Sequence, residues 1–328
     1  MPVRATELAA VLREGIARII VGNERTVFAF LLALLGHGHV LVEGVPGTAK
    51  TLIVRVLSAL LGAPFRRIQF TPDLMPADVV GTTVFNPKTA EFSLRRGPIF
   101  TTLLLADEIN RTPPKTQSAL LEAMEERQVT IDGESLPLPG LFLVCATQNP
   151  VEFEGTYPLP EAQLDRFFVR ARTEYPSEAQ ERGLLARTLA GFDAHDLVAA
   201  GVTQIAGVDD VLAAQAEIRG IYVAEALQGY LYQIVARTRA SSDLTLGASP
   251  RAAQALAIAT QAAAAIDGRD FATPDDVKAV APLVLPHRLI VRPESEVEGL
   301  DAETVLTRIL AAIEVPKEAA QRPNGTGH

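Results

Sequence analysis

The sequence predicts an α/β protein in which a parallel β-sheet is followed by a smaller helical part. Three apolar runs, at 40–42, 102–106 and 141–147, have the composition of buried strands, and helical spacing lies between them. Each run ends in polar residues. Because parallel sheets bind ligands at the carboxyl ends of their strands, these three ends predict one functional edge.

Length and composition allow about two domains with sizeable cores. The chain has 328 residues, 48% of them apolar, and domains of roughly 150 residues are usual. The longest apolar stretch, 27–35, is far shorter than the ~20 residues that a membrane span needs. No secretory pattern is visible at the N-terminus, and the one cysteine, Cys145, is expected in the core rather than as a nucleophile. We therefore expect a cytoplasmic protein.

The first predicted helix, 24–35, leads into the strand at 40–42 and then into a glycine-rich loop. The loop comprises Gly44, Val45, Pro46, Gly47, Thr48, Ala49, Lys50 and Thr51, and a helix follows over 50–61. In such a loop, backbone N–H groups face phosphates, Lys50 adds charge for the β- and γ-phosphates, and the Thr51 hydroxyl suits Mg²⁺. Ala49 replaces the usual glycine at a position that does not need positive φ. A glycine-rich turn without a ligand is the alternative.

Two adjacent carboxylates follow the strand at 102–106. Asp107 is expected to hold Mg²⁺, directly or through water, and Glu108 to act as the general base that activates a water molecule. The alternative is an acidic strand end that caps the next helix. At the end of the strand 141–147, Asn149 suits water positioning beside the γ-phosphate, although a plain Asn-Pro turn is also open.

Two segments indicate hairpins outside the sheet. A strand at 66–69 is followed by a long connection, about 71–99, whose alternating apolar residues flank the turn Asn86-Pro87-Lys88. After a helix from Pro114 to about Glu126, residues 128–138 flank the turn Asp132-Gly133-Glu134. Both hairpins could project toward a central pore or could only brace neighbouring subunits.

At this point the sequence resembles the MoxR family of AAA+ ATPases. The motifs that carry the resemblance are Gly44–Thr51, Asp107–Arg111, Gln117–Met124, Ala146–Pro150, Glu154–Phe167, Gly247–Ala252, Gly268–Asp270 and Thr273–Val277. They cover nearly the whole chain, and the alanine before Lys50 is itself similar to the family. The resemblance implies an AAA+ core, 1–175, with a five-stranded parallel sheet between helices. It also implies an all-α lid, 176–318, and we expect a disordered tail, 319–328.

The resemblance also implies roles for individual residues. Arg166 would be an arginine finger delivered to the nucleotide of a neighbouring subunit, and Arg251 the sensor-2 arginine that touches ATP phosphates. Arg111 is a weaker candidate for the same interface, and a surface ion pair is the alternative for Arg251. Val21, Gly22 and Leu52 are expected to contact the nucleotide too.

The helical part is expected to begin near Ser177, a helix cap. An apolar stripe along one helical face predicts core packing; it consists of Leu227, Tyr230, Leu231, Ile234, Val235 and Thr238. Thr273-Pro274 begins another helix with acids in its first turn. Ser249-Pro250 also begins a helix, but Arg251 then lies where the helix dipole disfavours a cation by a few tenths of a kcal/mol, which a nearby anion would offset.

The charge distribution bears on partners. The net charge is −9, and residues 176–328 hold 20 acidic against 13 basic side chains. No run of Lys and Arg exceeds two residues, and the pairs Arg66-Arg67 and Arg95-Arg96 are expected to be solvated or to contact another subunit. We expect no nucleic-acid partner, since such proteins carry a basic face.

The phosphate loop and the carboxylates predict ATP hydrolysis with Mg²⁺. The arginine-finger role that the resemblance implies for Arg166 requires a ring, so we expect a homo-oligomer, a hexamer. The resemblance implies chaperone-like remodelling, assembly or activation of client proteins, commonly with a partner that bears a von Willebrand factor A domain. Two alternatives stay open: an AAA+ nucleic-acid motor or loader, and a non-hydrolysing scaffold held together by nucleotide.

Overall fold

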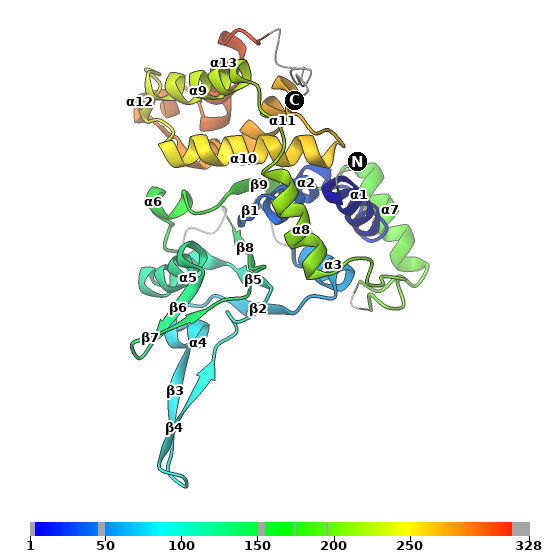
Figure 1. Ribbon diagram of the computed structural model, residues 1–328, viewed down its shortest axis with the longest axis vertical. Helices are drawn as coiled ribbons and strands as arrows, with labels where there is room; N and C mark the ends of the chain where they lie inside the picture. The colour runs from blue at the N-terminus through cyan, green and yellow to red at the C-terminus, as the bar shows by residue number, and fades with distance from the viewer. Residues whose placement is uncertain (1–3, 45–49, 150–154, 174, 195, 317–328) are drawn as a thin grey trace, which may run out of the picture.

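The computed structural model describes residues 4–44, 50–149, 155–173, 175–194 and 196–316 (Figure 1). Its centre is a five-stranded sheet in the order β2-β5-β8-β1-β9, and every pairing in it is parallel. The strands are β1 (Val40–Gly44), β2 (Phe65–Gln69), β5 (Leu103–Asp107), β8 (Leu143–Gln148) and β9 (Val169–Thr173). The predicted five-stranded parallel sheet is therefore confirmed.

Helices cover both faces of this sheet, which explains why its strands are apolar on both sides. Val40, Leu103 and Leu105 point into a core shared with α1 (Arg4–Ala17), α2 (Glu24–Leu35) and α3 (Lys50–Leu61). Their neighbours Leu41 and Leu104 point into a second core beneath α5 (Pro114–Glu126). The helices predicted over 24–35 and 50–61 have these bounds in the structure. The buried thiol of Cys145 has a pKa raised by burial, in keeping with a core role.

Both predicted hairpins are present. β3 (Gly81–Asn86) and β4 (Glu91–Arg96) form an antiparallel ribbon that extends away from the rest of the molecule in Figure 1, beyond α4 (Pro76–Val80). At its far end the rings of Phe85 and Phe92 lie 5.1 Å apart, and Phe92 is 72% exposed. β6 (Gln128–Ile131) and β7 (Glu134–Pro137) form the second, shorter hairpin.

The C-terminal part is mainly helical. Its helices are α7 (Glu178–Leu189), α8 (Val208–Ile218), α9 (Glu225–Arg239), α10 (Pro250–Ile266), α11 (Pro274–Val284), α12 (Pro293–Val297) and α13 (Ala302–Ala312). As predicted, Ser177 caps α7 and Ser249 caps α10 through their hydroxyls. One feature was not predicted: β10 (Leu244–Leu246) and β11 (Ile290–Val291) pair antiparallel. Strands of three and two residues are too short for a periodic signal.

The two parts share one continuous core, because α1 packs against α8 and α10 as well as α3. The apolar stripe predicted on α9 is buried in that core, including Leu227, Tyr230 and Ile234. Within the described ranges, none of the helices combines the length and the apolar character needed to cross a lipid bilayer. The tail from 319 to 328 lies outside the described residues.

Candidate active site

The predicted functional edge is formed where β1, β5 and β8 end. Gly44 is the last residue of β1 and Lys50 the first of α3, and the Lys50 ammonium donates to the Gly44 carbonyl at 2.6 Å. Burial lowers the pKa of Lys50, and the nearby Asp107 carboxylate opposes that shift. The loop residues Val45, Pro46, Gly47, Thr48 and Ala49 lie outside the described residues.

Close packing against β9 leaves room only for glycine at position 44. Its φ is +151°, and a Cβ there would lie 2.1 Å from Oγ1 of Thr173 on the neighbouring β9. A side chain would therefore push β1 and β9 apart just where the chain enters the loop. Thr51 and Leu52 follow in the first turn of α3, where both are partly buried.

Asp107 ends β5 and is held from two sides. Its Oδ1 accepts from the Thr147 hydroxyl at 2.5 Å, and its Oδ2 accepts from Nη2 of Arg67 at 2.7 Å and from Nε at 3.1 Å. Thr147 lies on the adjacent strand β8 and is buried. This places a fixed carboxylate beside Lys50, with oxygen chemistry that suits Mg²⁺.

Glu108 follows in a left-handed conformation with φ 57° and ψ 51°. Its N–H donates to the Thr147 hydroxyl at 2.9 Å, and its Oε2 accepts from Nε2 of Gln69 at 2.7 Å. Arg111 forms a longer ion pair with the same carboxylate at 3.3 Å. Glu108 precedes the short 3₁₀ helix η1 (Ile109–Arg111), but its side chain makes no capping bond. The capping alternative for this residue is therefore excluded.

Three contributors were missed at the level of sequence: Arg67, Gln69 and Thr147. We expected Arg67 to be solvated or to contact another subunit; its side chain is indeed half exposed, but the expectation missed that its guanidinium binds Asp107. The reason lies in the register of β2 and β5, in which Gln69 is paired with Asp107. Side chains two residues apart point to one face of a strand, so Arg67 and Gln69 both reach the carboxylates. Only knowledge of the strand order could have shown this.

Polar residues at the end of β8 complete this edge. Asn149 directly follows the strand and is half-buried, as is Gln148. Among the described residues, no group hydrogen-bonds to the buried Oε1 of Gln148. A buried acceptor without a partner at the edge of a sheet suits a ligand or its bound water.

A cavity of about 400 Å³ lies beside Gly22, a predicted nucleotide contact. Its walls include Ile16 and Ile20 of the segment around α1, and Val27 and Phe28 of α2. Because a short turn joins α2 to β1, the two run antiparallel, and the beginning of α2 lies at the same edge as Lys50. Gly22 itself has φ +72°, a conformation that favours glycine.

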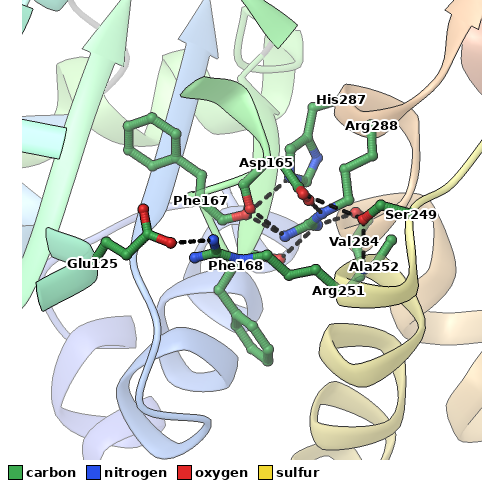
Figure 2. A network of polar contacts seen from close by, with 10 residues as sticks. All are labelled: Glu125, Asp165, Phe167, Phe168, Ser249, Arg251, Ala252, Val284, His287 and Arg288. Atoms are coloured by element: carbon green, nitrogen blue, oxygen red, sulfur yellow. Dashed lines mark hydrogen bonds and ion pairs between the residues drawn. The ribbon is translucent and has the colours of Figure 1, made fainter. Parts of the chain in front are cut away.

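Arg166 and Arg251 lie at the opposite edge of the sheet. Arg166 lies just before β9, at the amino end of that strand. Two residues later, the N–H of Phe168 donates to the carbonyl of His39, which lies at the amino end of β1. Both arginines contact Glu125, at the end of α5 (Figure 2 shows the bond from Arg251). Strands of five residues separate the two edges by about 15 Å. The structure thus brings Lys50, Thr51, Asp107, Glu108 and Asn149 to one edge and both arginines to the other.

A buried network ties the second edge to the helical part (Figure 2). Arg288, 3% exposed in its side chain, donates from Nε to Asp165 Oδ1 at 2.6 Å and from Nη2 to the Phe167 carbonyl at 2.6 Å. The Ser249 hydroxyl donates to the other Asp165 oxygen at 3.2 Å. Burial and the Arg288 charge lower the pKa of His287, which is therefore neutral and bonds to the same Phe167 carbonyl.

Comparison with known proteins agrees with this geometry. Residues 39–169 match the model of the ATPase family associated with various cellular activities (AAA), and residues 236–309 match the AAA lid domain. Chaperone MoxR1 of Mycobacterium tuberculosis is 42% identical over 94% of this chain and 83% of its own length. The chain is a member of the MoxR family of AAA+ ATPases.

Two further matches cover this MoxR-family chain almost completely. Uncharacterized protein YeaC of Bacillus subtilis is 47% identical over 92% of the chain and 93% of its own length. The crystal structure of a candidate ATPase from Cytophaga hutchinsonii superposes with a TM-score of 0.85 at 39% identity, covering 95% and 98% of the two chains. The family and the AAA+ fold with its lid, which the resemblance implied, are therefore confirmed.

Proposed function

We propose that this protein hydrolyses ATP with Mg²⁺ and uses the cycle to remodel, assemble or activate client proteins. The observation that carries the proposal is the pair Asp107 and Glu108, fixed beside Lys50 at the carboxyl edge of a parallel sheet. Family membership makes nucleotide binding the expected use of this edge. The oxygen ligands offered by Asp107 and Thr51 fit Mg²⁺, which prefers carboxylates, hydroxyls and water.

Each residue at the edge has a distinct task in this proposal. The Lys50 ammonium binds the β- and γ-phosphates, and Mg²⁺ held near Thr51 and Asp107 would neutralise charge on the same oxygens. Glu108 accepts a proton from a water molecule whose oxygen bonds to the γ-phosphorus, while the bond to the ADP oxygen breaks. Asn149 orients that water. The loop Gly44–Ala49 supplies backbone N–H groups, and Val21, Gly22 and Leu52 contact the nucleoside.

The cavity beside Gly22 supports a base site, because its size and apolar walls suit a planar ring. Burial lowers the pKa of Lys50, and the nearby charge of Asp107 opposes that shift and so favours the charged ammonium. Gln69 supports the general-base assignment as well, since its amide donates to Glu108 and leaves the other carboxylate oxygen to a water.

Arg166 and Arg251 act, in this proposal, on the nucleotide of a neighbouring subunit. Their separation from Lys50 by the length of the sheet supports a role in trans for both, since neither can reach this chain's own phosphates in this arrangement. Closed rings are the usual way for identical chains to share such sites. We propose a homo-oligomer, a hexamer, with ATP between subunits.

Client proteins are proposed to contact the hairpin of β3 and β4. Its tip exposes the aromatic pair Phe85 and Phe92, which make no contribution to either core. The relative from Mycobacterium tuberculosis is named a chaperone. A protein with a von Willebrand factor A domain is the partner we propose for the cytoplasmic complex, on the resemblance to the family.

The decisive experiment compares steady-state phosphate release by the wild type and Glu108→Gln. We expect Glu108→Gln to bind ATP but to release phosphate about 10²- to 10⁴-fold more slowly. Equal rates would remove Glu108 as the base, and no release by the wild type would favour the non-hydrolysing scaffold. Proteins retained by Glu108→Gln in ATP identify the client. Tight, salt-sensitive retention of DNA instead would favour the nucleic-acid motor.

A further inference from the structure

A single carboxylate connects the two arginines of the second edge. Glu125 Oε1 accepts from Nη1 of Arg251 at 2.7 Å, and Glu125 Oε2 forms an ion pair with Nε of Arg166 at 2.9 Å. The three side chains come from α5, from the residues before β9 and from α10, so they are far apart in sequence. Each is about a third to a half exposed, so the cluster is open to solvent.

The backbones of both arginines are also fixed relative to one another. Asp165, which precedes Arg166, accepts from the hydroxyl of Ser249, two residues before Arg251. Ser249 in turn caps α10 by accepting from the Ala252 N–H at 3.1 Å, and Arg288 holds the other oxygen of Asp165. The segments that carry the two arginines are thus joined by the bond between Asp165 and Ser249, and the two arginine side chains are joined by Glu125.

Stability alone does not account for this arrangement. An exposed ion pair contributes about 0–1 kcal/mol, and one arginine would be enough to satisfy Glu125. Arg251 is in the first turn of α10 and Glu125 in the last turn of α5, so each charge stands at the end of its helix where the dipole opposes it. Within Glu125, Asp165, Arg166, Arg251 and Arg288, three cations face two anions. The cluster therefore retains positive charge that suits an anion.

The guanidinium N–H groups that Glu125 does not bind also suit an anion. Glu125 takes only Nε of Arg166 and Nη1 of Arg251, and no other acceptor among the described residues takes a side-chain N–H of either arginine. Guanidinium groups bind phosphate oxygens through such paired N–H groups. Two guanidinium groups on one carboxylate therefore present several N–H donors, side by side, to one polyphosphate.

We infer that Glu125 is a positioning residue that aligns Arg166 and Arg251 so that both bind the triphosphate of a second copy of this chain. This rests on the proposed function and adds to it a residue that touches no substrate itself. The carboxylate fixes one edge of each guanidinium and leaves the other edge for phosphate. Without it, the two cations repel one another and their side chains separate.

The test compares Glu125→Gln, Glu125→Asp and Glu125→Ala with Glu126→Gln, a matched control on the neighbouring exposed residue of α5. We expect Glu125→Gln and Glu125→Ala to lower kcat by about 10- to 100-fold with the KM for ATP nearly unchanged, because the chain's own phosphate loop is intact. Glu125→Asp keeps the charge and should recover part of the rate. Glu126→Gln should match the wild type.

A second readout does not depend on turnover. ADP with aluminium fluoride mimics the transition state, where arginines in trans bind most strongly. We expect Glu125→Gln to release a fluorescent ADP from this complex about 10-fold faster than the wild type, but to release ADP alone at the same rate. Adding Glu125→Gln to Arg166→Ala should cause a smaller further loss than Glu125→Gln causes in the wild type, because the contribution of Arg166 is already lost and only the alignment of Arg251 is left to disturb.

The outcomes separate the inference from the proposed function. If Arg166→Ala is impaired but Glu125→Gln equals the wild type in both readouts, the positioning role is wrong and the ATPase proposal stands. If the wild type releases no phosphate, the ATPase proposal fails first. If Glu125→Gln and Arg166→Ala add their full effects, or if Glu125→Gln changes the release of ADP alone, Glu125 acts by another route and the inference is overturned.

Discussion

Arg288→Met is expected to destabilise the protein more than any exposed charge change. The Arg288 guanidinium donates to the Asp165 carboxylate and to the carbonyls of Asp165, Phe167, Phe168 and Val284. Methionine fills most of the space but donates nothing, so buried acceptors lose their partners. Removing one member of a buried charged network costs about 3–5 kcal/mol. Asp165 is 23% exposed and regains some water, so we expect a value near the lower end, about 3 kcal/mol.

Urea denaturation followed by circular dichroism measures this change in the free energy of unfolding. The control is Arg182→Met, which removes the exposed pair with Glu178, an i,i+4 contact of 2.8 Å on α7. That change is expected to stay within about 0.5 kcal/mol. A loss below 1 kcal/mol for Arg288→Met, or equal losses for both variants, would refute the claim that this network joins the sheet to the helical part.

Three further predictions follow from single contacts. Thr147→Val removes the hydroxyl that bonds both Asp107 and the Glu108 N–H. The free energy of unfolding, measured by denaturation, should therefore fall by about 1–3 kcal/mol, and kcat, measured by phosphate release, should fall as well. Burial lowers the pKa of His39 to about 3. The unfolded chain therefore binds a proton at His39 more readily than the folded chain does. The contribution of His39 to the free energy of unfolding is complete above its ordinary pKa and should decline by about 1.4 kcal/mol per pH unit as the pH falls toward 3. Denaturation midpoints between pH 7 and pH 5 check the sign of this dependence, and His39→Asn should reduce its slope. Phe92→Ser, at an exposed position, should leave stability within about 0.5 kcal/mol but reduce the stimulation of ATP hydrolysis by client protein; unchanged stimulation would remove the hairpin from the client surface.

The features that could be predicted from the sequence are those set by local pattern. Apolar spacing gave the bounds of α2 and α3, and the glycine-rich loop with Asp107-Glu108 gave the edge of the sheet where Lys50 and the carboxylates meet. These signals are contained in one helix, one strand or one turn, so no knowledge of tertiary structure was needed.

The features that could not be predicted depend on which elements become neighbours. Arg67 reaches Asp107 only because β2 pairs with β5, two strands separated by a hairpin insertion. Glu125 is an ordinary acidic residue of an exposed helix face until Arg166 and Arg251 are brought beside it from two other elements. The anion predicted to offset the unfavourable position of Arg251 is thus present, but its identity required the tertiary structure.

The central claim is that the catalytic site is completed by arginines from a neighbouring chain. Mixing Lys50→Ala, which lacks a working phosphate site, with Arg166→Ala, which lacks its finger, tests this in one measurement of phosphate release. Each variant alone should be inactive. Random mixing in a closed ring should restore roughly a quarter of the interfaces, namely those in which the intact phosphate site of an Arg166→Ala subunit faces the intact Arg166 of a Lys50→Ala subunit. A mixture that stays as inactive as its components, under conditions where both variants assemble together, would contradict the account.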